Sequence, residues 1–70
     1  MKVYDITCAF DYGNGMAIVA ANSEEDAARI FGVEELTEDR YDNMRTEISL
    51  LEDMEYFGKE GVITAIWYEE

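Results

Sequence analysis

Carboxylates are by far the most abundant side chains with acid–base chemistry in this chain. The sequence contains seventeen Asp and Glu residues among 70, one cysteine and no histidine. Neighbouring pairs such as Glu34 with Glu35 have the chemistry of a general acid and base, but so many acids produce adjacent pairs by chance. Histidine, the commonest general base and transition-metal ligand, is absent. We therefore expect that the protein is not an enzyme.

The sequence also contains no motif for a metal ion or a cofactor. Cys8 is the sole cysteine and lies in an alternating strand pattern, so we expect a buried thiol rather than part of a zinc site. Gly13 and Gly15 fall between two strand patterns, where they are typical of a turn and not of a phosphate-binding loop. Asp11 precedes them without the other oxygen ligands of a calcium loop. We expect neither metal nor cofactor.

The charge of the chain is its main functional signal. Five Lys and Arg residues leave a formal net charge of −12. Such a chain repels nucleic acids, so we expect a basic, nucleic-acid-binding protein as its partner. Solvation of an ordinary acidic surface is the alternative reading. The expected partner-binding residues are the acids between positions 24 and 42, with one tyrosine as anchor: Glu24, Glu25, Asp26, Glu34, Glu35, Glu38, Asp39, Asp42 and Tyr41.

The stretch from Ala17 to Gly32 predicts a strand that leads directly into a helix. The short apolar run ends before Ser23, whose hydroxyl is a good N-cap, and three acids follow in the first turn. Ala27, Ile30 and Phe31 share one face at helical spacing. Glu25 and Arg29 have the spacing of an i, i+4 ion pair. Gly32, followed by apolar Val33, predicts the helix end.

The residues before this stretch predict a β-hairpin. Lys2 to Tyr12 alternates between apolar and polar residues, and Asn14-Gly15 is a strong signal for a tight turn. A two-residue loop at Asn14-Gly15 would pair Cys8 with Ala21, Phe10 with Val19 and Tyr12 with Ala17. A three-residue loop, which would place Ile18 on that face instead, is the alternative that we favour less.

The second half of the chain predicts two further strands. Residues 34–44 have few apolar anchors and fit either a short helix or a loop. The segment from Arg45 to Asp53 contains an alternating strand pattern. The segment from Val62 to Tyr68 is rich in β-branched and aromatic residues. It places Val62, Ile66 and Tyr68 on one face and Ile63, Ala65 and Trp67 on the other, so this strand is expected at the sheet centre or at an interface.

The resulting order is β-β-α-β-β. We expect a single α+β domain over residues 1–70, a two-layer sandwich with an antiparallel sheet of three to four strands and the main helix on one face. The N-terminal residues lack the apolar core of a signal peptide, and no apolar run reaches the length of a membrane span. We therefore expect a cytoplasmic protein that contacts no membrane, either as a monomer or as a homodimer.

In size, single domain, acidity, layout and lack of catalytic residues, the chain resembles the small phage-encoded anti-CRISPR proteins that act as DNA mimics. The resemblance covers the whole chain and involves no shared residue motif. It implies an inhibitor in the bacterial cytoplasm that occupies the DNA- or PAM-binding site of a Cas effector subunit without catalysis. The alternative is a small structural or adaptor module, of phage or bacterial origin, that dimerises through a sheet edge or the second face of residues 62–68.

Overall fold

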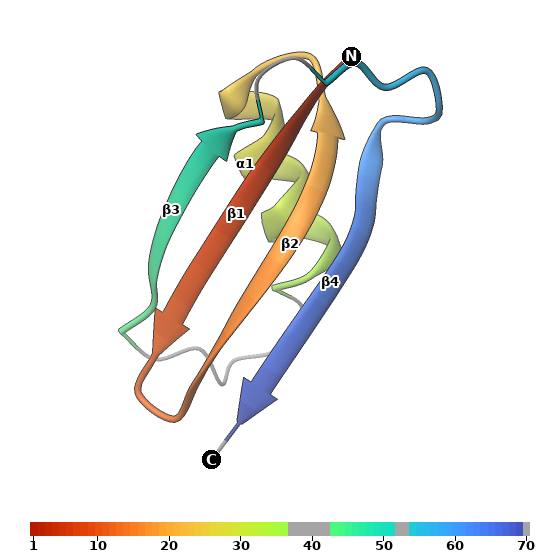
Figure 1. Cartoon of the computed structure of the whole chain (residues 1–70). Helices are drawn as coiled ribbons and strands as arrows, with labels where there is room; N and C mark the ends of the chain where they lie inside the picture. Colours follow the sequence, from red (N-terminus) through yellow and green to blue (C-terminus); the bar gives the residue numbers. More distant parts are fainter. Residues whose placement is uncertain (37–42, 52–53, 70) are drawn as a thin grey trace.

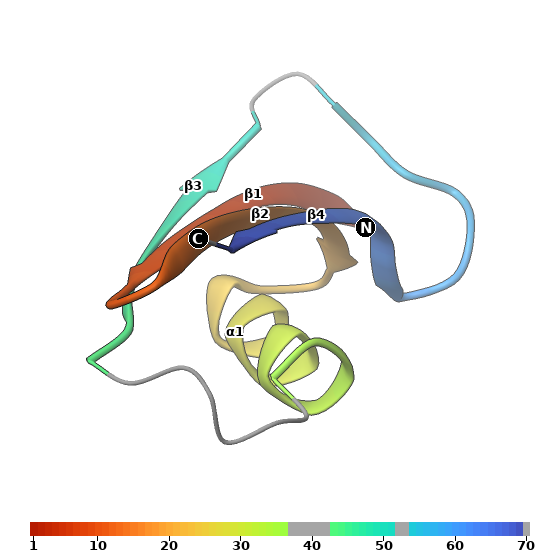
Figure 2. The same ribbon diagram turned by 90° about the horizontal axis from the view of Figure 1, so that it is seen from below.

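A computed structural model describes residues 1–36, 43–51 and 54–69. Its elements are, in chain order, β1 (Lys2–Phe10), β2 (Gly13–Ala21), α1 (Glu24–Glu34), β3 (Arg45–Leu50) and β4 (Gly61–Glu69). The four strands form one antiparallel sheet with the order β3-β1-β2-β4, and α1 lies against one of its faces (Figures 1 and 2). The predicted α+β two-layer class is confirmed. Within the described residues, no helix is long and apolar enough to cross a bilayer.

The hydrophobic core lies between α1 and the two central strands. Alternate residues of β1 and β2 point toward the helix, which contributes the face that its spacing predicts. Ile6 and Val19 are completely buried, and each such side chain stabilises the fold by roughly 1.5–3 kcal/mol. The buried cluster consists of Tyr4, Ile6, Cys8, Ala17, Val19, Ala21, Ala27, Ile30 and Phe31.

The helix begins where its sequence predicts and ends later. The Ser23 hydroxyl accepts a hydrogen bond from the Asp26 backbone N–H at 3.1 Å, so the N-cap is confirmed. The predicted stop at Gly32 is wrong, because α1 continues to Glu34 and the N–H of Glu35 still donates to the Phe31 carbonyl. Val33 is 70% exposed and makes no capping contact with the core. The sequence predicts either a short helix or a loop over residues 34–44. Within this range, residues 37–42 lie outside the described residues.

The hairpin turn is at Asp11-Tyr12, so the predicted Asn14-Gly15 turn is wrong. Phe10 pairs with Gly13 and Ile6 with Ala17, which extends the β1–β2 ladder to nine residue pairs. The expected register would leave the first half of β1 without a partner. The two registers differ by six residues along β2, an even number. The side chains within β1 and β2 therefore keep their predicted faces, although their partners change. Tyr12 is the exception, because it lies in the turn and is 67% exposed instead of pairing with Ala17.

Strand β4 is an edge strand, so of the two positions expected for it the sheet centre is wrong, and the position at an interface stays a prediction. It pairs with β2 alone among the described strands. A register shift between Ile18 and Val19 leaves Ile63 as an extra residue in β4. Because of this bulge, Val62 packs toward the core with Ala65 and Trp67. Strict alternation predicts the other face for Val62, and that prediction is wrong.

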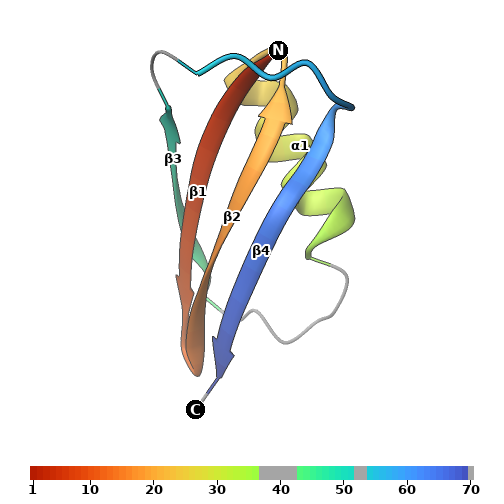
Figure 3. The ribbon, with the colours of Figure 1, turned by 45° about the vertical axis from the view of Figure 1, so that its right-hand side comes forward.

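The connection from β3 to β4 crosses the end of the sheet, because these strands lie at opposite edges. Residues 54–60 pass close to the N-terminus, on the side away from α1 (Figures 2 and 3). The Tyr56 N–H donates to the Met1 carbonyl at 3.0 Å, and the Met1 amino group donates to the Tyr56 carbonyl at 3.2 Å. The Leu51 N–H donates to the Val3 carbonyl after the end of β3, a strand that the sequence pattern extends to Asp53.

Candidate partner-binding surface

The acids of the first helical turn are displayed at one end of α1. Glu24 and Glu25 are exposed, and with Ala28 they line an open depression beside Ile48 of β3. Asp26 is half-buried and forms an ion pair with Arg29 at 3.5 Å. Arg29 also approaches Glu60 at 4.0 Å, so its partners are these two acids and not the predicted Glu25. The positive end of the helix dipole stabilises all three first-turn carboxylates.

The acids at the other end of α1 hold the helix to β4. A Glu34 carboxylate oxygen accepts a hydrogen bond from the Val62 N–H at 3.4 Å. A Glu35 carboxylate oxygen accepts one from the Trp67 indole N–H at 3.0 Å. The Trp67 ring stacks on Phe31, with centroids 6.0 Å apart. These contacts give both acids a structural role and explain why the helix continues past Gly32.

The remaining predicted site residues, Glu38, Asp39, Tyr41 and Asp42, lie outside the described residues. The structure therefore places five of the nine predicted residues and separates them into two groups at opposite ends of α1. Other acids lie elsewhere on the body. Asp5 and Glu47 belong to the sheet face away from the helix, and Asp11 accepts a hydrogen bond from Asn43 at the hairpin end.

The helix-free face of the sheet carries Ile66 and Tyr68, which the strand pattern places on one face, together with Met16, which the sequence pattern does not reveal. Met16 pairs with Ile66 and is 38% exposed, while Ile66 is 49% exposed. Tyr68, on the same face, is 66% exposed. These three residues line an open depression between β1, β2 and β4. Pairing of β2 with β4 creates this patch, so only the register could have revealed Met16 as a member.

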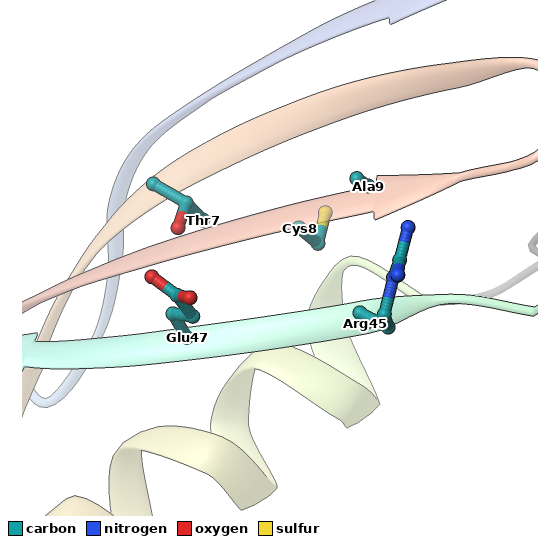
Figure 4. A pocket seen from close by; sticks show the side chains of 5 residues that line it. All are labelled: Thr7, Cys8, Ala9, Arg45 and Glu47. Carbon is teal, nitrogen blue, oxygen red and sulfur yellow. The ribbon is translucent and has the colours of Figure 1, made fainter.

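A second open depression lies on the β3 side of this face. Figure 4 shows Arg45 and Glu47 extending from β3 toward the side occupied by Thr7 and Ala9 of β1. The two charges are opposite in sign. Cys8 also lines this depression, but it is only 5% exposed and burial raises the pKa of its thiol above the ordinary value. A protonated thiol is a poor nucleophile.

The acidic residues that the structure describes are thus distributed over the whole molecule and are not confined to one face. Their exposed members include Glu24 and Glu25 on α1, Glu47 on β3 and Glu55 in the crossing segment. Among the described residues, no three metal-ligating side chains are grouped as they would be around an ion. Comparison with protein-family models, curated proteins and solved structures finds no match to this chain.

Proposed function

We propose that this protein is a non-enzymatic inhibitor in the bacterial cytoplasm. It binds a basic nucleic-acid-binding protein, such as a CRISPR-Cas effector subunit, and blocks recognition of DNA or of the PAM. The observation that supports this proposal is the charge carried per unit length. A net charge of −12 over a body 35 Å long gives about one negative charge per 3 Å, against one per 1.7 Å for duplex DNA and 3.4 Å for a single strand.

The physical basis of inhibition is that the chain and the nucleic acid compete for the same Lys and Arg side chains of the target. A nucleic-acid-binding groove presents Lys and Arg side chains in an array that neutralises phosphates. Exposed carboxylates on a folded body attract that array over long range and accelerate the encounter. Aromatic side chains then contribute to the affinity of the complex, since they are frequent anchors of protein interfaces. Among the described aromatic side chains that could serve as anchors, Phe57 is 90% exposed, Tyr68 is 66% exposed and Tyr56 is half-buried.

Competition with DNA tests the proposal directly. Purified Cas effector complexes of several types are titrated with the chain at 50 and 200 mM salt, with and without their target duplex. We expect one complex to bind the chain at least tenfold more weakly at the higher salt. We also expect the chain and the duplex to exclude each other. A ternary complex, or affinity independent of salt, would contradict the proposal.

A charge-neutralised variant locates the effect on the described acids. The variant combines Glu24→Gln, Glu25→Gln, Glu47→Gln and Glu55→Gln, which leave the contacts of α1 with β4 intact. We expect at least a tenfold loss of affinity and a matching loss of protection in a plasmid-interference assay. Circular dichroism checks that the variant is folded. The double variant Glu34→Gln with Glu35→Gln is the comparison, because it changes acids already engaged with β4.

A structural or adaptor module is the second candidate function. One observation favours it, namely that no described strand pairs with the outer side of β4, where Ile63, Ile66 and Tyr68 are exposed. A module of this kind associates with a second copy through that strand. Sedimentation at micromolar concentration distinguishes the candidates, since a stable dimer without any basic partner supports the adaptor.

A further inference from the structure

The two edges of the sheet differ in how they are protected against pairing. Strand β3 has six residues and carries the exposed charges of Arg45 and Glu47. Short length and charged side chains are common devices that keep an edge from accepting another strand. Strand β4 has nine residues and no charged residue between Gly61 and Tyr68. Proline, another such device, is absent from the sequence.

Contacts at the start of β4 limit the part of its outer edge that could pair with another strand. The Val62 N–H already donates to Glu34, and Gly61 has a φ of 146°, a conformation that favours glycine. The bulge at Ile63 interrupts the ladder next to this point. The stretch from Thr64 to Tyr68 follows as regular strand, and Figure 3 shows it at the margin of the sheet with β2 on its inner side.

We infer that the outer edge of β4 is a docking site for an extended segment of a basic protein, which adds a fifth strand to the sheet. Backbone hydrogen bonds supply affinity in this mode of recognition, and side chains at alternate positions supply specificity. Ile66 and Tyr68 provide such contacts on the helix-free face, at 49% and 66% exposure. The inference rests on the proposed function for the identity of its partner.

Charge selects a basic partner over a second copy of the chain. Carboxylates of Glu34 and Glu60 lie at the start of β4 and that of Glu69 at its end, and Arg29 approaches Glu60 at 4.0 Å. A second copy brings another net charge of −12 to the same edge, whereas Lys and Arg residues that flank a strand reduce the repulsion. The occupant is therefore a β-forming segment with basic residues at its ends.

A synthetic peptide tests the edge without knowledge of the natural target. The probe has nine residues, with Lys at both ends and alternating Thr and Val between them. It is titrated into the 15N-labelled chain, and amide shifts and amide hydrogen exchange are recorded. We expect shifts centred on β4 and at least tenfold slower exchange within Thr64–Tyr68. Two matched peptides carry Glu at both ends or Pro at the centre, and we expect each to bind at least tenfold more weakly.

Any of the following results would overturn the inference. Absence of binding, equal binding of the proline peptide, or shifts centred on α1 or β3 would show that the edge does not accept a strand. Formation of a dimer through β4 before peptide is added would assign the edge to a second copy. Equal binding of the Glu-ended peptide would remove the role of charge.

Two lysine variants separate this inference from the proposed function. Ile66→Lys adds a charge beside the β4 edge, and Val33→Lys adds the same charge on an exposed helix position. In the competition assay with an effector complex, we expect Ile66→Lys to weaken binding at least tenfold and Val33→Lys less than threefold. Equal effects of the two variants would refute the docking site alone. Failure of the unmodified chain to compete with DNA would refute the proposed function, while the peptide result would stand.

Discussion

Trp67 is the residue that connects most parts of this small core. It stacks on Phe31, lies 6.2 Å from the ring of Phe10 and donates its indole N–H to Glu35. Its ring also covers Gly15 so closely that a Cβ atom there would overlap it. Gly15 is therefore needed for the approach of an aromatic ring, not for a turn.

Replacement of Gly15 by alanine tests this close approach. The added methyl group displaces Trp67 from Phe31, so we expect the free energy of unfolding to fall by about 1–3 kcal/mol. Trp67 is the only tryptophan, and its fluorescence should shift to longer wavelength in the folded variant. Urea unfolding followed by fluorescence measures both effects. An unchanged spectrum and stability would show that the ring does not cover Gly15.

The thiol of Cys8 gives the protein a predictable response to alkaline pH. Burial raises the pKa of this thiol in the folded state, so the unfolded chain loses its proton first, near the ordinary pKa of about 8.5. Stability from this group is complete below that pH and decreases above it, by up to about 1.4 kcal/mol per pH unit. Urea unfolding from pH 7 to 10 should show a decrease in the native chain that is absent in Cys8→Ala. Parallel profiles for the two proteins would contradict the assignment.

At the scale of elements, the end of α1 is the feature that its local sequence predicts wrongly. Gly32 lies inside α1, where a Cβ atom would meet no neighbour within 4 Å, and it does not have positive φ. Its role as a left-handed terminator is therefore excluded. The helix extends because Glu34 and Glu35 bind residues of β4 that lie 28 and 32 residues further along the chain.

Alanine at position 32 should consequently stabilise the protein. Glycine inside a helix costs about 0.5–1 kcal/mol relative to alanine, and no clash opposes the change. We expect Gly32→Ala to raise the free energy of unfolding by that amount in urea denaturation. Gly61→Ala is the matched control and should destabilise, because its φ of 146° is unfavourable for alanine. A loss of stability in Gly32→Ala would restore the left-handed terminator.

The sequence predicts those elements that are determined by nearby residues. Ser23 and the acids after it define the helix start locally, and alternation in β1 defines which side chains face the core. The sequence predicts the wrong hairpin register because Asn14-Gly15 is a strong local turn signal, whereas the native register is determined by a longer ladder and by Trp67 over Gly15. The edge position of β4 and the bulge at Ile63 depend on pairing with β2, which no local pattern encodes. Glu34 and Glu35 also depend on distant residues. Their contacts with β4 cannot be predicted from the local sequence, which indicates only that they are acids able to bind a partner.

At the scale of the whole molecule, self-repulsion is the main electrostatic feature. Seventeen acids and five basic residues are confined to a body with a radius of gyration of 11.9 Å. Many of the distances between charges exceed about 10 Å, the Debye length near 0.1 M salt, so dissolved ions weaken much of the repulsion. The unfolded chain separates the same charges further and gains less from screening.

Salt should therefore stabilise the folded chain. We expect the free energy of unfolding to rise by on the order of 1 kcal/mol between 0.02 and 0.3 M sodium chloride. Thermal unfolding over this range measures the effect, and the variant with four Glu→Gln changes should show a smaller increase. No increase in either protein would mean that its carboxylates are already compensated by their surroundings.

The direction of the first and last strands of the chain also determines how the molecule resists a mechanical load. Strands β1 and β4 are each antiparallel to β2, so they run the same way, and Lys2 and Glu69 lie at opposite ends of the sheet (Figure 1). A force that pulls these residues apart acts along the strands and shears the two ladders of β2. Many hydrogen bonds then share the tension at once, in contrast to a geometry that unzips them singly. This small sheet is consequently built to withstand stretching between its ends better than peeling from one edge.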